Sequence, residues 1–265
     1  MIAEIISVGT EILLGNILNT NARYLARKLA SAGIEVHFQT VVGDNPSRIM
    51  DAVKIAYTRA DMVIMTGGLG PTKDDITKEM LAEYFHSSLV YDETAISMME
   101  ETLQRTRKES LLQSLKKQAL VPENAKVLYN LHGLAPGIIM EDEDKICILL
   151  PGPPKEMEPM FEEYCFPYLV EKSHQVLVSL NIKLLDFDHA PVIKVGEAPV
   201  ADALGDLLDT QNPTVATYAK DDGCLIRLTA LAADRKAALA MLYPLAEKIR
   251  SIIGTEYINY MEEEE

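Results

Sequence analysis

The fold is decided by one stretch, Asp61-Met62-Val63-Ile64-Met65-Thr66-Gly67-Gly68-Leu69-Gly70-Pro71-Thr72-Lys73-Asp74-Asp75. Its apolar start predicts a buried strand, and the chain then passes directly into a turn with three glycines. A helix is expected from about Asp75. A strand that leads through a glycine turn into a helix is the repeating unit of a parallel α/β sheet. The stretch therefore predicts a ligand loop at the carboxyl end of a central strand.

The glycines of this turn, Gly67, Gly68 and Gly70, can adopt positive φ and have no Cβ, so successive amides can point at one anion. The start of the following helix adds partial positive charge, and the Thr72 hydroxyl can donate to a phosphate oxygen. The pattern GxxxxGK[ST] is absent, so the turn is not a P-loop. A tight turn that needs glycine only for packing explains the cluster about equally well.

The same alternation extends on both sides of this stretch. Strands are expected at 4–8, 34–42 and 146–150, and helices at 21–32, 46–59 and 155–169. Gly33 is expected to end the first helix. Strands and helices that alternate in this way favour right-handed crossovers. Residues 1–170 are therefore predicted to form a three-layer, doubly wound α/β domain with a mainly parallel sheet.

After residue 170 the pattern changes. Strands are expected at 176–185, 214–219, 224–231 and 256–259, with helices at 200–208 and from Asp234 to 253. The order β-α-β-β-α-β is that of a split βαβ, ferredoxin-like fold. Residues 171–260 are therefore predicted to form a smaller α+β domain, and residues 261–265 an acidic tail.

Acidic residues follow two of the predicted strands. Asp44 follows the strand at 34–42, and Asp74 and Asp75 follow the glycine turn. The carboxyl ends of parallel strands converge, and carboxylates are ligands for hard divalent cations, so a Mg, Mn or Co site is expected here. The alternative is an acid that caps a helix. One of Asp74 and Asp75 is expected to cap the helix and the other to act in the site.

Two further loops join strand ends to helix starts. The first contains Thr10, Glu11, Asn16 and Asn21, which are candidates for contacts with a substrate, although Asn21 could equally be an N-cap. In the second, residues 151–156, the candidates are Gly152 and Lys155, and a proline-fixed turn is the alternative.

Composition limits the partners of the chain. The net charge of -15 argues against nucleic-acid binding. No apolar run approaches the roughly 18–20 residues that span a bilayer, and no basic region precedes the first predicted strand. The expectation is a cytoplasmic protein with no membrane partner. Its ligand is expected to be a small nucleotide, and the second domain is expected to contribute to a homodimer.

Four motifs together resemble the competence- and damage-inducible CinA family. They are residues 9–15 with 19–21, 66–75, 151–157 and 212–219. The first domain is similar to the molybdopterin-binding superfamily. The resemblance implies a metal-dependent ADP-ribose pyrophosphatase that yields AMP and ribose 5-phosphate. Asp75 and Asp44 match acids of that superfamily, whereas Asp74 stands where molybdenum-cofactor relatives usually have arginine, which weakens a molybdopterin function.

The predicted chemistry places a diphosphate across the amides of residues 67–72. Asp75, Asp44 and Asp74 are the candidate metal ligands, Asp75 and Asp44 the main catalytic residues, and Glu11 a candidate general base. Two alternatives stay open: an enzyme of molybdenum-cofactor assembly that binds or adenylylates molybdopterin, and a nucleotide-binding module without catalysis. Longer relatives have a nicotinamide-mononucleotide amidase domain, which this sequence does not show.

Overall fold

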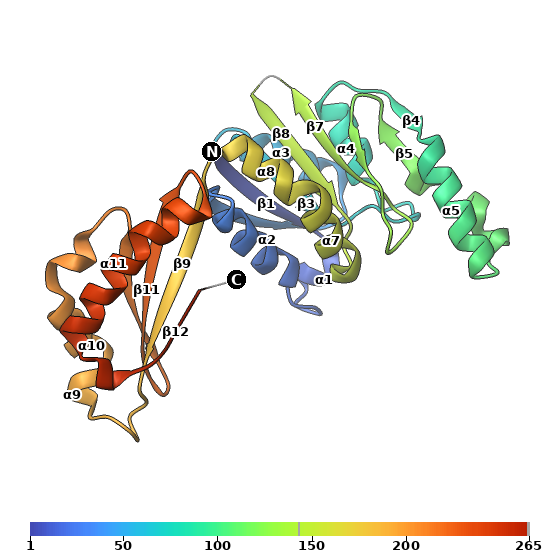
Figure 1. The fold of residues 1–265 in the computed structure, drawn as a ribbon. Helices are drawn as coiled ribbons and strands as arrows, with labels where there is room; N and C mark the ends of the chain where they lie inside the picture. The colour runs from blue at the N-terminus through green and yellow to red at the C-terminus, as the bar shows by residue number, and fades with distance from the viewer. Residues whose placement is uncertain (143, 264–265) are drawn as a thin grey trace. The chain divides into compact units, whose positions relative to one another are not determined.

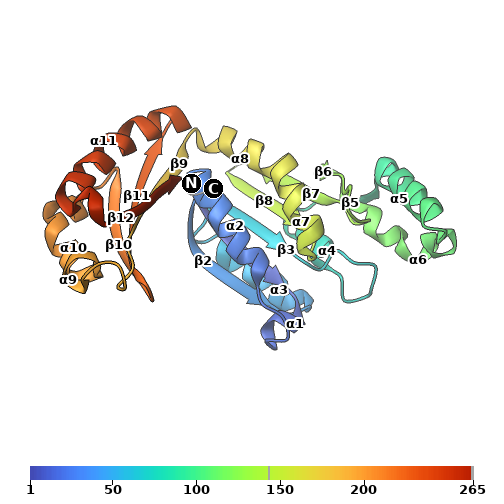
Figure 2. The same cartoon turned by 60° about the horizontal axis from the view of Figure 1, so that its bottom comes forward.

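The computed structural model describes residues 1–142 and 144–263, which form two compact units. Unit 1 comprises Met1–Ala30 and Ile34–Lys172, and unit 2 comprises Ser31–Gly33 and the chain from Ser173. Figures 1 and 2 show unit 1 as a sheet between helices and unit 2 as a sheet with helices on one face. None of the helices in the described residues is long and apolar enough to cross a membrane.

The main sheet of unit 1 has six strands in the order β2-β1-β3-β8-β7-β6. Four neighbours, β2 (Glu35–Val42), β1 (Ile2–Val8), β3 (Met62–Thr66) and β8 (Lys145–Leu150), are parallel, whereas β7 (Gly137–Asp142) and β6 (Lys126–Leu128) are antiparallel to their neighbours. The predicted mainly parallel α/β sheet is confirmed. The antiparallel edge was not expected, because hydrophobic periodicity predicts a strand but not the direction in which it pairs with a distant one.

Helices cover both faces of this sheet. Side chains alternate along each strand, so Ile6, Val63 and Leu149 lie on one face and pack in one core cluster with α3 (Pro46–Ala56) and α4 (Thr77–Tyr84). The other face is covered by α2 (Thr20–Ser31), α7 (Pro154–Met160) and α8 (Phe166–Ser173). A π-helical turn, Phe161–Cys165, joins α7 to α8. The three predicted layers are therefore present.

The remaining elements of unit 1 are short, apart from α5. They are α1 (Thr10–Leu13), β4 (Leu89–Tyr91), α5 (Glu93–Arg105), η1 (Glu109–Leu111), α6 (Leu112–Leu115), η2 (Lys116–Ala119) and β5 (Leu120–Pro122). The charged segment 92–118 is largely helical. Asp92 caps α5 by accepting the amide of Ala95 at 2.7 Å.

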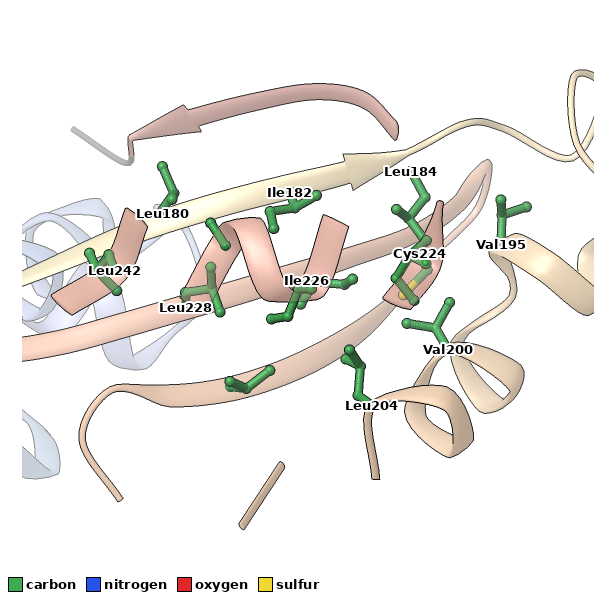
Figure 3. Close-up of a cluster of buried hydrophobic side chains, with 14 of the residues drawn as sticks. Leu180, Ile182, Leu184, Val195, Val200, Leu204, Cys224, Ile226, Leu228 and Leu242 are labelled. Atoms are coloured by element: carbon green, nitrogen blue, oxygen red, sulfur yellow. The ribbon is translucent and has the colours of Figure 1, made fainter. Parts of the chain in front are cut away.

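Unit 2 has an antiparallel sheet in the order β10-β11-β9-β12. The elements follow the chain as β9 (Val176–Leu184), α9 (Val192–Val195), α10 (Glu197–Leu204), η4 (Gly205–Asp209), β10 (Thr214–Lys220), β11 (Gly223–Ala232), α11 (Arg235–Ile253), η5 (Thr255–Tyr257) and β12 (Ile258–Glu263). This order is that of the predicted ferredoxin-like domain. Figure 3 shows the core, in which Leu180, Ile226 and Leu242 come from two strands and α11.

The predicted acidic tail is wrong for residues 261–263. They belong to β12, in which Met261 is paired with Ile182 of β9. Edge pairing satisfies the backbone of an acidic segment while its carboxylates stay outside the core, a combination that charge alone does not reveal. Residues 264 and 265 lie outside the described residues.

Candidate functional site

A cavity of about 700 Å³ lies beyond the carboxyl ends of β1, β3 and β8, a volume typical of small-molecule sites. Nine of the predicted site residues line it: Glu11, Asn21, Asp44, Gly67, Gly68, Gly70, Asp74, Asp75 and Gly152. The structure therefore brings together residues from four separate loops, as expected for an open parallel sheet.

Four predicted residues do not line this cavity: Thr10, Asn16, Thr72 and Lys155. Residues 10–13 form the short helix α1, which the sequence analysis did not anticipate, and Thr10 is used there to bond Asp44. Lys155 lies in the first turn of α7 and is exposed. Successive helical residues point about 100° apart, so Glu156 lines the cavity and Lys155 does not.

The glycine turn has packing requirements of its own. Gly67 has φ +100° and Gly68 has φ +68°, and a Cβ on Gly68 would stand 2.0 Å from Thr77 Oγ1. The Gly67 amide donates to Leu150 O at 3.1 Å, so it is engaged within the sheet. Among the described residues, the amides of Gly68, Leu69 and Gly70 have no acceptor. The predicted row of anion-binding amides is therefore shorter than 67–72 and centres on 68–70.

Asp75 and Asp74 stabilise the turn and do not cap a helix. Asp75 Oδ2 accepts hydrogen bonds from Thr72 N at 2.9 Å and Thr72 Oγ1 at 2.5 Å. The helix α4 begins later, at Thr77, without a side-chain cap. The expectation that one of these acids caps the helix is therefore wrong, because the turn extends two residues further than predicted.

Asp74 is held in its ionised form. The single hydroxyl hydrogen of Thr72 is shared between Asp75 Oδ2 and Asp74 Oδ1, and its bond to Asp74 lowers the pKa of the Asp74 carboxyl below its usual range. A backbone hydrogen bond and the nearby Lys117 act in the same direction. Such a carboxylate is a poor proton acceptor and a good ligand for a cation.

Asp44 is positioned by the start of α1. Its Oδ2 accepts from both Thr10 N and Thr10 Oγ1, each at 2.9 Å. These bonds satisfy the first amide of the helix and fix the carboxyl group at the cavity wall. Asp44 thus has a structural role besides any role in ligand binding.

Two asparagines at the start of α2, Asn19 and Asn21, have different roles. Asn19 Oδ1 accepts from Ala22 N at 3.2 Å, so Asn19 caps the helix. Asn21 is nearly buried, and its Nδ2 donates to Gly152 O at 2.7 Å across the two loops. Its Oδ1 has no hydrogen-bond partner among the described residues. An unpaired buried acceptor costs roughly 1–3 kcal/mol, which a ligand donor would offset.

Three residues that sequence analysis missed also belong to this region. Gln118 and Glu156 line the cavity, and Asn130 Nδ2 donates to Glu156 Oε2 at 2.7 Å. Gln118 Nε2 donates to Leu69 O at 3.4 Å, and its Oε1 has no described partner. Gln118 lies in a helical segment with no motif around it. Glu156 lies within the residue 151–156 loop, so its place next to a predicted strand end was the available signal.

Charge sets this cavity apart from an ordinary phosphate site. Five carboxylates line it, from Glu11, Asp44, Asp74, Asp75 and Glu156, and none of the lining residues in the described chain is Lys or Arg. Lys117 lies behind the turn, where its Nζ donates to the carbonyls of Thr72 and Asp75. An anion in this cavity therefore requires a cation from solution, unless amides alone neutralise it.

The residues that line the cavity fit a divalent cation only if oxygen atoms of the bound ligand complete the coordination shell of the cation. No group of three or more His, Cys, Asp or Glu in the described residues is arranged to hold a metal by itself. Magnesium is commonly held by one or two carboxylates together with substrate phosphates and water. The donor set therefore suits a cation that arrives with a phosphate ligand, not a preformed cage.

The comparisons with known proteins agree with this fold. Residues 4–171 match the family model described as "Probable molybdopterin binding domain", and residues 191–258 match "Damage-inducible protein CinA KH domain". A crystal structure of the protein CinA with unknown function from Thermoplasma acidophilum is 35% identical. The match spans 64% of the present chain and 97% of the Thermoplasma chain, with a TM-score of 0.57. Unit 1 is therefore a molybdopterin-binding-like domain.

The chain belongs to the CinA family. A CinA-like protein of Dictyoglomus thermophilum is 47% identical over 259 residues, covering 97% of this chain. A protein of Clostridium beijerinckii described as competence-damage inducible is 50% identical over 268 residues, covering 99% of this chain. The chain spans 61% and 63% of the lengths of these two relatives. Residues 191–258 of the second unit thus match the KH domain of the family, where the sequence predicted a ferredoxin-like α+β domain.

Proposed function

We propose that the 700 Å³ cavity binds a diphosphate together with a divalent cation and hydrolyses it, with ADP-ribose as the substrate. One observation supports this most directly: five carboxylates and no basic side chain surround three unengaged amides of the glycine turn. A diphosphate accompanied by a cation matches that mixture of charges. The choice of ADP-ribose rests on the family resemblance.

Each group has a defined task in this reaction. The amides of residues 68–70 bind non-bridging phosphate oxygens and stabilise their developing charge. Asp75 and Asp44 would hold Mg, Mn or Co, which when bound neutralises the diphosphate and favours ionisation of an attacking water. Glu11 accepts the proton of that water. The water oxygen bonds to one phosphorus, and the bridging oxygen leaves with the other, giving AMP and ribose 5-phosphate.

Asn21 is the residue we assign to the ribose beyond the diphosphate. Its unpaired Oδ1 is an acceptor for a sugar hydroxyl, and its amide nitrogen is already fixed on Gly152 O. A site that is built to bond a hydroxyl discriminates against a ligand without it. ADP-ribose is therefore expected to be cleaved in preference to ADP. Thr10 and Asn16, which were also expected to contact the substrate, do not line the cavity and have no part in this proposal.

A product assay tests the proposal. ADP-ribose, ADP, NAD and FAD are incubated with the chain, with and without Mg, Mn or Co, and AMP is measured. We expect AMP from ADP-ribose only with a metal, at a rate at least about tenfold above that with ADP.

A substitution tests the role of Asp75. In Asp75→Asn, which keeps one oxygen to accept the hydrogen bond from Thr72, turnover should fall at least about a hundredfold with little change in melting temperature. Metal-independent turnover, or a wild-type rate in Asp75→Asn, would contradict the mechanism.

A second candidate function is pterin binding without hydrolysis. It is favoured by the description of the family model that matches residues 4–171. Titration with a pterin phosphate, followed by pterin fluorescence, distinguishes the two. Tight pterin binding together with no AMP from any substrate and metal would favour this second function. Nucleotide binding without turnover would favour a non-catalytic module.

A further inference from the structure

A second cavity, of about 290 Å³, lies in unit 1 and shares no lining residue with the first. It is formed by the carboxyl-terminal part of α5, by the turn that follows it with η1 and α6, and by the loop 131–134 between β6 and β7. We call it the α5 pocket. The proposed function does not use any residue that lines it.

The wall of the α5 pocket is largely aliphatic. Five leucines line it: Leu103, Leu111, Leu115, Leu131 and Leu134. Leu103 is 3% exposed and belongs to the packed core, whereas Leu111 is 44% exposed and Leu131 is 62% exposed. Apolar surface left in water at the mouth of a pocket favours a ligand that covers it, by roughly 25 cal/mol for each Å².

Cations stand beside this apolar wall. Arg105 and Lys108 both line the pocket, and neither forms an ion pair with a described residue. His132 lines it as well. Glu109 follows Lys108 in sequence but does not line the pocket. The chain has a net charge of -15, yet the charged side chains that line this pocket are positive.

We propose that the α5 pocket is a binding site for a small amphipathic monoanion, a short aliphatic chain that ends in a carboxylate. The carboxylate pairs with Arg105, whose planar guanidinium can bond both oxygens, and Lys108 adds a second positive charge. The chain lies against Leu111 and Leu131 and removes them from water. The volume is near the lower end for ligand sites and therefore suits a small ligand.

The pocket is tied to the first cavity by one side chain. Asn130 Oδ1 accepts from His132 N at 3.0 Å, at the start of the pocket loop. Asn130 Nδ2 donates to Ala135 O at 3.0 Å and to Glu156 Oε2 at 2.7 Å, and both of these residues line the first cavity. The loop 131–134 and Glu156 are therefore linked through the hydrogen bonds of one side chain, Asn130.

Three probe molecules distinguish the contribution of the carboxylate to binding from that of the aliphatic chain. Hexanoate has both, acetate has only the charge, and hexan-1-ol has only the chain. Each is titrated into the full chain while backbone amide shifts are followed by NMR. We expect saturable shifts at residues 131–134 with hexanoate, which should bind at least about tenfold more tightly than acetate or hexan-1-ol. Equal binding of acetate, or no binding of hexanoate up to about 10 mM, would overturn the proposal.

Variants locate the site. Arg105→Ala combined with Lys108→Ala should weaken hexanoate binding at least about tenfold. Lys54→Ala should not, although Lys54 is also a cation in the last turn of its helix, α3. Leu131→Asp places an anion in the wall at an exposed position and should also abolish binding without lowering the melting temperature. Unchanged hexanoate affinity in both pocket variants would overturn the assignment. None of these measurements depends on ADP-ribose turnover.

Discussion

Lys78 is a lysine whose side chain is buried, which is unusual for its type. Its side chain is 4% exposed, and Nζ donates to Gln118 O behind the glycine turn. Burial lowers the pKa of Lys78 to about 8, because a buried ammonium loses its hydration. Glu79 and Asp75 oppose this shift, and Lys117 adds to it.

The stability of the chain should therefore rise with pH through this group. Below pH 8, Lys78 is protonated in both the folded and the unfolded states, and the folded state bears the cost of a buried cation. Between about pH 8 and the unfolded value of 10.5, the unfolded chain binds more protons, so the free energy of unfolding increases with pH. The full shift corresponds to about 3 kcal/mol at most.

Urea unfolding at pH 7, 8, 9 and 10 measures this contribution, with Lys78→Met as the comparison. The variant removes the titrating group and keeps an unbranched side chain of similar length. We expect the difference in unfolding free energy between wild type and variant to change with pH by about 1–3 kcal/mol in favour of the wild type. Parallel pH profiles of the two proteins would show that Lys78 titrates normally.

At the scale of elements, the link from β3 to α4 depends on glycine for two reasons. Gly68 has φ +68°, and a Cβ would stand 2.0 Å from the buried Thr77 Oγ1. Gly15 has a similar φ of +72°, with nothing within 4 Å of the position of its Cβ. The two positions therefore separate the cost of backbone conformation from the cost of a steric clash.

Alanine substitutions at these two glycines give a matched pair. Gly15→Ala should lower the unfolding free energy by about 1 kcal/mol, the cost of a left-handed residue with a Cβ. Gly68→Ala should lower it by about 3 kcal/mol or more, because Thr77 must move as well. Chemical denaturation of both variants measures the difference. Equal losses would mean that the turn relaxes around the added methyl group.

At the scale of the whole molecule, we predict a homodimer to which unit 2 contributes. The strands β10 and β12 are the edges of its four-stranded sheet, and an edge leaves backbone groups available to another chain. Light scattering at micromolar concentration should give twice the chain mass of 29.4 kDa. Residues 1–172, expressed alone, should give a monomer. A monomeric full chain would exclude the dimer, and a dimeric fragment would place the contact in unit 1.

Much of the fold was open to prediction from sequence because its signals are local. The run 62–65 leads into a glycine turn, and Gly33 at φ +70° ends the preceding helix, as expected for a residue without a Cβ. Asp234, where a helix was predicted to begin, caps α11 by accepting the amide of Ala237 at 2.8 Å. Each of these features involves residues within a few positions of one another, so the order of strands and helices could be predicted from the sequence.

The sequence by itself determined the α/β order, the second α+β unit and the loops that meet at the cavity. Only the tertiary structure decided which side chains of those loops face one another. Asn21 meets Gly152 across more than a hundred residues, and Gln118 reaches Leu69 from a helix without a motif. Such contacts depend on where the sheet brings distant segments together, whereas periodicity and glycine act through neighbouring residues.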